Sequence, residues 1–398
     1  MNYIQTTIQF IQNKFATNDF IPLHAPVFNG NERKYVMDTI DSTFVSSVGA
    51  YVDKAEQMMA KISQTKKAVA VVNGTSGLQI ALQLTGVQAG EEVLTQALTF
   101  VATANAIHYT GAEPVFLDVD YDTMGLSAKA VSEFLEKFGE KRENGTFNKK
   151  TGKRISACVP MHTFGFPVHL DALMDVCNEW NIPVVEDAAE SLGSYYKGKH
   201  TGSFGKFGVF SFNGNKIITT SGGGMLVSDD EEKIKKVRFW STQSRDAARH
   251  YQHSELGFNY RMSNVVAGIG RGQLKVLDQR VAKKKYIFEF YKRELGQLEG
   301  VEFMPINDWN EPNYWLSVMT LKSTVRPLDV MEALEKENIE SRPVWKPMHM
   351  QPFFAEYDYV GGDVSEKLFE NGVCLPSDTK MTDEDLERIS GIIKSLWK

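Results

Sequence analysis

Cysteine is scarce in this sequence, which restricts both the location and the chemistry that we expect. The three cysteines, Cys158, Cys177 and Cys374, are odd in number and far apart, so they suit neither a disulfide framework nor a metal site. The N-terminus lacks the basic start and the apolar stretch of a secretion signal. We therefore expect the protein to work in the reducing cytoplasm.

Long apolar runs and an excess of positive charge are also absent. No run approaches the roughly 20 apolar residues of a membrane-spanning helix, so we expect no membrane partner. The formal net charge is −6, and no basic patch of useful size is present for a nucleic acid to bind. The basic pairs at 141–142 and 149–150 stand in a polar stretch with Gly145 and Gly152, which favours a solvated loop.

Several widespread cofactor and metal motifs are missing as well. No Gly-Lys-Ser/Thr follows the glycine at position 74, which excludes a Walker nucleotide loop. The glycines at 221–224 and 268–273 lack the Gly-x-Gly-x-x-Gly spacing of a dinucleotide fold, which disfavours a nicotinamide enzyme. We predict no metal site, because neither HExxH nor clustered Cys/His spacing is found around four histidines, His162, His169, His250 and His253.

The chain has 398 residues, of which 42% are apolar and 24% charged, as in a soluble globular protein with one large and one smaller domain. Apolar residues at helical spacing from Ile4 to Phe15 predict a short amphipathic helix before the main body. We place an N-terminal helix and arm at 1–25, a large domain at 26–255 and a small C-terminal domain at 256–398.

Short apolar strands alternate with helical stretches through the large domain. The strands are predicted at 68–72, 92–94, 114–118, 155–159 and 183–187. This alternation predicts an α/β fold with a mostly parallel sheet covered by helices on both faces. The small α/β domain is predicted from a long helical stretch near 264–294, a strand at 315–321 and helices at about 327–338 and 382–396.

Three segments at the predicted strand ends carry candidate chemistry, since ligands bind beyond the carboxyl ends of such strands. The turn at 73–77, with hydroxyls of Thr75 and Ser76, fits a phosphate cradle or a simple capped helix start. Asp187 could pair with a protonated ring nitrogen, bind a metal or cap the next helix. Lys216 stands in a turn beyond a strand; most lysines lie on the surface, but a desolvated amine is nucleophilic enough to form a Schiff base.

Together these segments resemble the fold-type I enzymes that use pyridoxal 5'-phosphate (PLP), and more narrowly the DegT/DnrJ/EryC1/StrS nucleotide-sugar aminotransferases. The shared pattern is an acid after one strand and a lysine 29 residues later, beside a glycine run. The resemblance runs from about Ile21 to the C-terminus, and its most telling segments are 213–226, 185–190 and 257–264.

Within that family, the segments 22–26 and 44–49 and the extra N-terminal helix are similar to the branch that serves legionaminic acid synthesis, with the bacillosamine-forming enzymes as close relatives. This resemblance implies transfer of an amino group from glutamate to C4 of a nucleotide-linked 4-keto-6-deoxy-N-acetylhexosamine, for surface-glycan or nonulosonic acid synthesis. The choice between UDP and GDP and the stereochemistry of the new amine stay open.

The resemblance also assigns roles to matching positions. Lys216 would anchor PLP and move the substrate Cα proton, while Asp187 would pair with the pyridine nitrogen. Phe100 would stack on the ring, and Glu190 stands where many relatives place Gln or His near the phenolic oxygen. Asn259 would reach the cofactor phosphate of the neighbouring subunit, which requires a homodimer. The phosphate would be held by three hydroxyl side chains, Thr75, Ser76 and Ser211.

Substrate contacts are expected in the segment 342–349, which resembles the family's C-terminal substrate segment. Arg342 or Lys346 would meet the diphosphate, and Trp345 would pack on an apolar face of the substrate. A proline-rich connector with a core tryptophan is the alternative interpretation. Weaker candidates for the same role are His349, Arg245 and His250.

Two other functions fit the same fold. A PLP-dependent sugar dehydratase would carry histidine in place of the anchoring lysine, as the family resemblance implies, and Lys216 argues against it. A non-catalytic relative, such as a regulator, would usually have lost Lys216 or Asp187, and both are present. Appended DNA-binding segments are also absent, so the sugar aminotransferase is the favoured interpretation.

Overall fold

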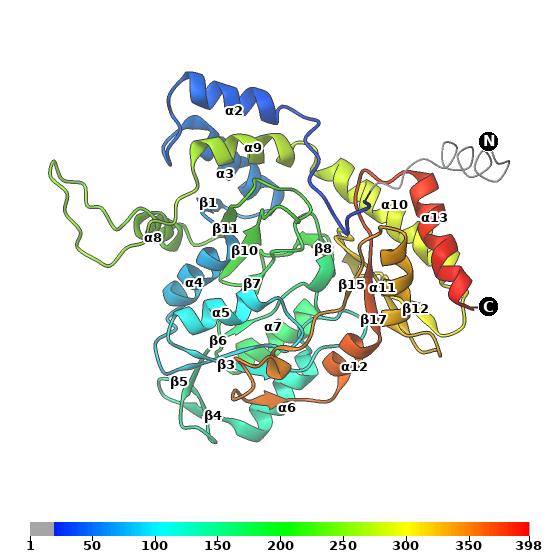
Figure 1. Ribbon diagram of the computed structural model, residues 1–398. Coiled ribbons are helices and arrows are strands. Elements are labelled where there is room, and N and C mark those ends of the chain that lie inside the picture. The colour runs from blue at the N-terminus through cyan, green and yellow to red at the C-terminus, as the bar shows by residue number, and fades with distance from the viewer. Residues whose placement is uncertain (1–19, 398) are drawn as a thin grey trace.

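The structure is a computed structural model that describes residues 20–397 (Figure 1). The helix predicted between Ile4 and Phe15 therefore lies outside the described residues. Within the described range, no helix combines the length and the apolar character needed to cross a lipid bilayer.

The centre of the molecule is a sheet in which two ladders of four and six strands meet. The ladders are joined by parallel bridges from Cys158 to Val184 and from Met161 to Asp187. In spatial order the central strands are β3 (Glu113–Leu117), β2 (Glu92–Gln96), β6 (Arg154–Val159), β7 (Val185–Asp187), β10 (Phe207–Ser211), β11 (Gly224–Ser228) and β1 (Lys67–Val71). Among these strands β11 alone runs antiparallel to both neighbours, so the predicted mostly parallel α/β sheet is confirmed.

Both faces of the sheet are covered, which is why its strands are apolar on successive residues. Val69 and Val209 pack on one face with α4 (Gly74–Thr85), α5 (Val101–Tyr109) and α8 (Glu231–Ser241). The next residues along the same strands, Ala70 and Phe210, pack on the opposite face with α3 (Ala50–Ile62), because side chains alternate along a strand.

The predicted helix near 264–294 is two helices, which corrects that expectation. They are α9 (Asn264–Leu274) and α10 (Leu277–Leu295), and the chain leaves the helical path at Lys275 and Val276. The break lets α9 pack against α2 (Glu32–Asp41) and α3, while α10 leads to a second sheet. Figure 1 shows this second sheet and its helices beside the central sheet.

The second sheet belongs to the C-terminal part of the chain. Its strands, in order, are β12 (Val301–Phe303), β14 (Ser317–Leu321), β17 (Gly372–Leu375) and β15 (Arg342–Pro343). Apolar side chains of α10, α11 (Pro327–Lys336) and α13 (Asp383–Lys394) cover it. The division of the chain at residues 25 and 255 stays a prediction, although the two sheets fit it.

The polar stretch predicted as a solvated loop is a β-hairpin on the edge of the central sheet. Its strands are β4 (Gly139–Arg142) and β5 (Gly145–Asn148). The prediction was wrong because inward-facing residues anchor the hairpin: Asn148 donates to Glu92 at 2.9 Å, and the Thr146 hydroxyl donates to the Trp180 carbonyl at 2.5 Å.

The remaining elements are short or lie at the periphery of the fold. They are α6 (Ala128–Phe138), α7 (Leu170–Glu179), α12 (Val364–Asn371), β8 (Tyr195–Tyr196), β9 (Lys199–His200), β13 (Asn310–Glu311), β16 (Tyr359–Val360) and the 3-10 turns Thr163–Gly165, Met348–Met350 and Ser395–Trp397.

Candidate active site

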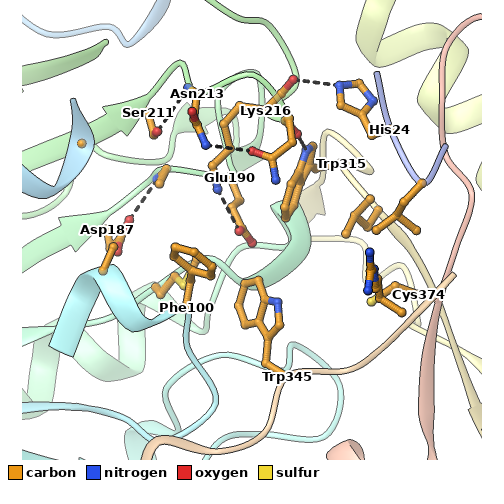
Figure 2. Close-up of a pocket in the computed structure, with 18 of the residues that line it drawn as sticks. His24, Phe100, Asp187, Glu190, Ser211, Asn213, Lys216, Trp315, Trp345 and Cys374 are labelled. Carbon is orange, nitrogen blue, oxygen red and sulfur yellow. Dashed lines mark hydrogen bonds and ion pairs between the residues drawn. The ribbon is translucent and has the colours of Figure 1, made fainter. Parts of the chain in front are cut away.

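A cavity of about 810 Å³ opens at the carboxyl ends of β7 and β10, where the central sheet faces the C-terminal part of the chain (Figure 2). Its volume lies in the range of small-molecule sites, and its position agrees with the rule for open α/β sheets. The predicted site residues that line it are Thr75, Phe100, Asp187, Glu190, Ser211, Lys216, Arg342, Trp345 and Lys346.

Asp187 ends β7 and is almost fully buried at the floor of the cavity, where 2% of it is exposed. One carboxylate oxygen accepts a hydrogen bond from the Thr103 hydroxyl at 2.6 Å, and the other accepts from the Ala189 N–H at 3.1 Å. Burial raises the pKa of Asp187 above its ordinary value, and the bond from Thr103 opposes this shift. Neither bond supplies a positive charge, so Asp187 offers its acceptor capacity to a cationic ligand.

The neighbouring acid, Glu186, binds backbone N–H groups and does not face the cavity. Its carboxylate accepts backbone N–H bonds from Gly202, Phe204 and Gly205 at 2.6–2.7 Å and contacts His162 Nε2 at 3.0 Å. Burial alone would raise the pKa of Glu186, but these hydrogen bonds hold it below its ordinary value. Glu186 therefore ties the loop before β10 to the sheet, and Asp187 is the acid that faces the cavity.

Lys216 is buried, in contrast to the surface position that is usual for a lysine, and 8% of it is exposed. Its Nζ donates to Glu190 Oε1 at 3.0 Å and lies 4.5 Å from the centroid of the Trp315 ring and 5.8 Å from that of Phe100. Glu190 also accepts the Phe164 N–H at 2.9 Å. Burial raises the pKa of Glu190 to about 7, so its carboxyl is poised to change protonation near neutral pH.

The turn before α4 is both a capped helix start and an open anion site. Asn73 is the capping residue, since its side chain accepts the Ser76 N–H at 2.8 Å. The other first-turn N–H groups have no acceptor within the helix and lie at the cavity with the Thr75 side chain. A Cβ on Gly74 would come within 3.1 Å of the Ser211 Cβ, so glycine allows the two segments to approach. Ser76 itself does not line the cavity.

The predicted substrate residues are only partly brought together. Trp345 lies with its ring centroid 6.0 Å from that of Phe100 and 4.7 Å from that of Phe164, so it forms part of the cavity wall. Arg342 pairs with Glu340 at 2.6 Å at the rim. Lys346 has no ion-pair partner among residues 20–397 and remains available to an anion.

Besides Ser76, four predicted residues lie outside this cavity. His349 stacks on Tyr359 with ring centroids 3.8 Å apart. Arg245 and His250 belong to an exposed segment between α8 and α9, which projects from the body in Figure 1. Asn259 is exposed at the base of the same segment. Its predicted contact with a neighbouring subunit stays a prediction.

Sequence patterns did not single out several residues that shape the cavity. Thr103, Trp315 and His24 look like ordinary helix, strand and loop residues, because their partners come from distant parts of the chain. No metal site was predicted; within the described residues Asp120, Asp122 and His169 have potential ligand atoms within 4.8 Å of one another. His169 is already paired with Asp122, outside the cavity.

The fold and the cavity define a fold-type I aminotransferase that depends on PLP. The donor set fits this cofactor, because the site combines a buried acid for the ring nitrogen, a desolvated lysine for the aldehyde and a helix start for the phosphate. The chain belongs to the DegT/DnrJ/EryC1/StrS aminotransferase family, whose model matches residues 27–394.

Known relatives match nearly the whole chain. It is 45% identical over 381 residues to EpsN of Bacillus subtilis (strain 168), named as a pyridoxal phosphate-dependent aminotransferase, and the match covers 95% of this chain and 96% of that protein. The GDP-perosamine synthase of Escherichia coli O157:H7 is 34% identical, with 95% and 99% covered. The crystal structure of the aminotransferase TlmJ from Streptoalloteichus hindustanus superposes with a TM-score of 0.85 at 27% identity, covering 94% of this chain and 98% of that one.

Proposed function

We propose that this enzyme transfers an amino group from glutamate to the 4-keto carbon of a nucleotide-linked sugar, with Lys216 as the covalent anchor and proton carrier. The observation that carries the proposal is the environment of Lys216, an amine buried among aromatic rings and paired with one carboxylate. The buried position keeps bulk water from the amine, and a lysine amine is the side-chain group that forms Schiff bases with aldehydes.

The residues around Lys216 divide the work of transamination. Bound PLP supplies an aldehyde and a ring that accepts electrons. Asp187 keeps the ring nitrogen protonated, and Thr103 holds that carboxylate in place. Lys216, when released from the cofactor, takes the Cα proton of glutamate and later returns a proton at the carbon that receives nitrogen. Phe100 and Trp315 exclude water from the amine.

A sugar nucleotide is supported as the second substrate by the rim and by the relatives. Lys346 offers a cation without an ion-pair partner in the described part of the chain, Arg342 a guanidinium, and Trp345 an apolar face. GDP-perosamine synthase, at 34% identity, is named for a nucleotide sugar. Our finer proposal is a 4-keto-6-deoxy-N-acetylhexosamine, linked to UDP or GDP, in the legionaminic acid or bacillosamine branch suggested by the segments 22–26 and 44–49.

A chemical trap tests the anchor. Borohydride treatment of the protein with PLP should fix the cofactor on the peptide that contains Lys216, as read by mass spectrometry. Lys216→Ala should lose this label and the half-reaction with glutamate. Lys206→Ala, which changes an exposed lysine just before β10, is the control and should keep both. A label on another lysine would contradict the proposal.

The substrate is tested by incubating the enzyme with glutamate and a panel of UDP- and GDP-linked 4-keto sugars, with and without an N-acetyl group. A product whose mass fits replacement of the keto oxygen by an amino group and a hydrogen identifies the acceptor, and NMR gives the configuration at C4. Amination of only non-acetylated GDP sugars would contradict the finer proposal and favour an enzyme like the perosamine synthases.

We further propose that the enzyme is a cytoplasmic homodimer whose two active sites each receive Asn259 from the partner chain. The exposed segment between α8 and α9 supports this, since it projects from the body with Tyr251 and Leu256 78% and 81% exposed. Exposed apolar residues on a projecting segment suit a surface that another chain covers.

A further inference from the structure

A second buried lysine, Lys284 on α10, lies behind the cavity and has no role in the chemistry described above. It is 0% exposed. Its Nζ donates to the Trp315 carbonyl at 2.8 Å and contacts His24 Nδ1 at 3.0 Å. Neither partner is a carboxylate, so two neutral hydrogen bonds and the more distant charge of Asp378 oppose the desolvation of this amine.

Both partners of Lys284 also hold the backbone around Lys216. His24 Nε2 lies 3.0 Å from the Lys216 carbonyl oxygen, and Trp315 Nε1 donates to the Asn215 carbonyl at 2.7 Å (Figure 2). A carbonyl only accepts, so His24 must donate through Nε2. The neutral ring then accepts at Nδ1, which makes Lys284 the donor in that contact. The hydrogen bonds therefore run in one direction, from Lys284 to the two peptide units beside Lys216.

We propose that Lys284 is a positioning residue of the reaction, which fixes the backbone of Lys216 through His24 and Trp315. This inference rests on the function proposed above for Lys216. Asn213 and Asn215 are exposed, and a Cβ on Gly214 would meet no atom within 4 Å, so the turn has little packing of its own. A lysine that alternates between anchor and base needs a fixed backbone, because its amine must return to the same place.

The protonation of Lys284 does not alter this role. Burial lowers the pKa of Lys284 to about 7, and burial followed by the charge of Lys284 lowers the pKa of His24 well below its ordinary value. A neutral amine still has two N–H groups, which match the two acceptors. The chain of bonds therefore persists whether or not Lys284 carries a charge, provided that His24 is neutral.

The first test replaces the amine with an apolar side chain of similar length. Lys284→Met should weaken PLP binding by the apoprotein several-fold. It should also slow the half-reaction with glutamate about tenfold, while the glutamate concentration that gives the half-maximal rate stays the same. Lys285→Met, an exposed neighbour on α10 paired with Glu289, should match the parent protein in both measurements. Circular dichroism melting of the apoproteins shows that the variants are folded.

The second test separates a shared chain of bonds from general damage. His24→Phe cuts the contact with the Lys216 carbonyl but leaves the Trp315 branch, so it should reproduce a part of the losses of Lys284→Met. If Lys284→Met does not fold, His24→Phe tests the inference on its own. The double variant should lose less than the product of the two single losses, because both changes act through one chain. Parent-like binding in either single variant, or multiplied losses in the double variant, would overturn the inference. Failure to trap PLP on Lys216 in the parent protein would instead refute the proposed function.

Discussion

Two carboxylates three residues apart, Asp187 and Glu190, show how burial and partners together set the state of a side chain. Burial raises the pKa of both. Asp187 faces the position proposed for the ring nitrogen, so a bound cation there would favour its charged form. Glu190 faces Lys216 instead, and its pKa of about 7 allows it to share or release a proton as that amine changes state.

Glu190→Gln should remove a titration that the folded protein undergoes near neutral pH. The pKa of Glu190 is higher in the folded chain, at about 7, than the roughly 4.3 expected of an unfolded chain. Its contribution to stability is therefore fully present below the unfolded value and is lost as the pH rises through 7. As the pH is raised from 5 to 8, the melting temperature of the parent apoprotein should fall relative to that of the variant. Parallel curves for the two proteins would show that Glu190 does not titrate in this range.

Asp187→Asn and Glu186→Gln should fail in different ways, although the two acids are adjacent. The Asp187 variant loses the partner of the ring nitrogen, so we expect it to fold and to slow the glutamate half-reaction by a factor on the order of 100. The Glu186 variant replaces a carboxylate that holds three backbone N–H groups, and we expect a loss of stability of about 2 kcal/mol. Denaturant unfolding and single-turnover kinetics separate the two, and the reverse pattern would exchange the roles assigned here.

At the level of elements, the start of α4 supplies the proposed phosphate site. Thr75→Val and Ser211→Ala should each weaken PLP binding about tenfold, because each removes a hydroxyl donor to a charged phosphate. Thr85→Val, at the opposite end of α4, removes a hydroxyl that donates to the Ala81 carbonyl and should leave the affinity unchanged. Absorbance titration of the apoproteins measures the affinities. Equal losses in all three variants would indicate damage to the helix rather than to a phosphate site.

The elements also explain which parts of the fold the sequence predicts. The strands of the central sheet are short apolar runs, the acid ends one of them and the lysine lies in the turn that follows another, so local patterns reveal both. The break at Lys275 depends on the packing of α9 against α2 and α3, which no local pattern contains. Lys284 stands between two other lysines in an apparently polar run, and only the distant partners His24 and Trp315 distinguish it. Residues of the site whose partners lie more than 30 positions away in the sequence therefore cannot be predicted from local patterns.

For the whole molecule, the cavity lies between two parts of the chain that both contribute to its wall. Asp187 and Lys216 come from the central sheet, whereas Trp345 and Lys346 come from the C-terminal part. A change at the rim should therefore affect the sugar nucleotide and leave glutamate alone. Lys346→Met should raise the KM for the sugar nucleotide about tenfold with an unchanged glutamate half-reaction, as measured by steady-state and single-turnover kinetics. A slower glutamate half-reaction would place Lys346 in the chemistry instead.

A hybrid dimer tests whether the site is completed by a second chain. Co-expression of Lys216→Ala and Asn259→Ala chains with different tags yields dimers that carry one of each. If Asn259 serves the partner's site, the chain that retains Lys216 receives an intact Asn259, and the hybrid should recover about half of the parent activity per dimer, for one of its two sites. If Asn259 served its own chain, every site in the hybrid would lack one residue and activity would stay at the level of the single variants. Light scattering of the purified hybrid confirms the dimer, and an active monomer would remove Asn259 from the site altogether.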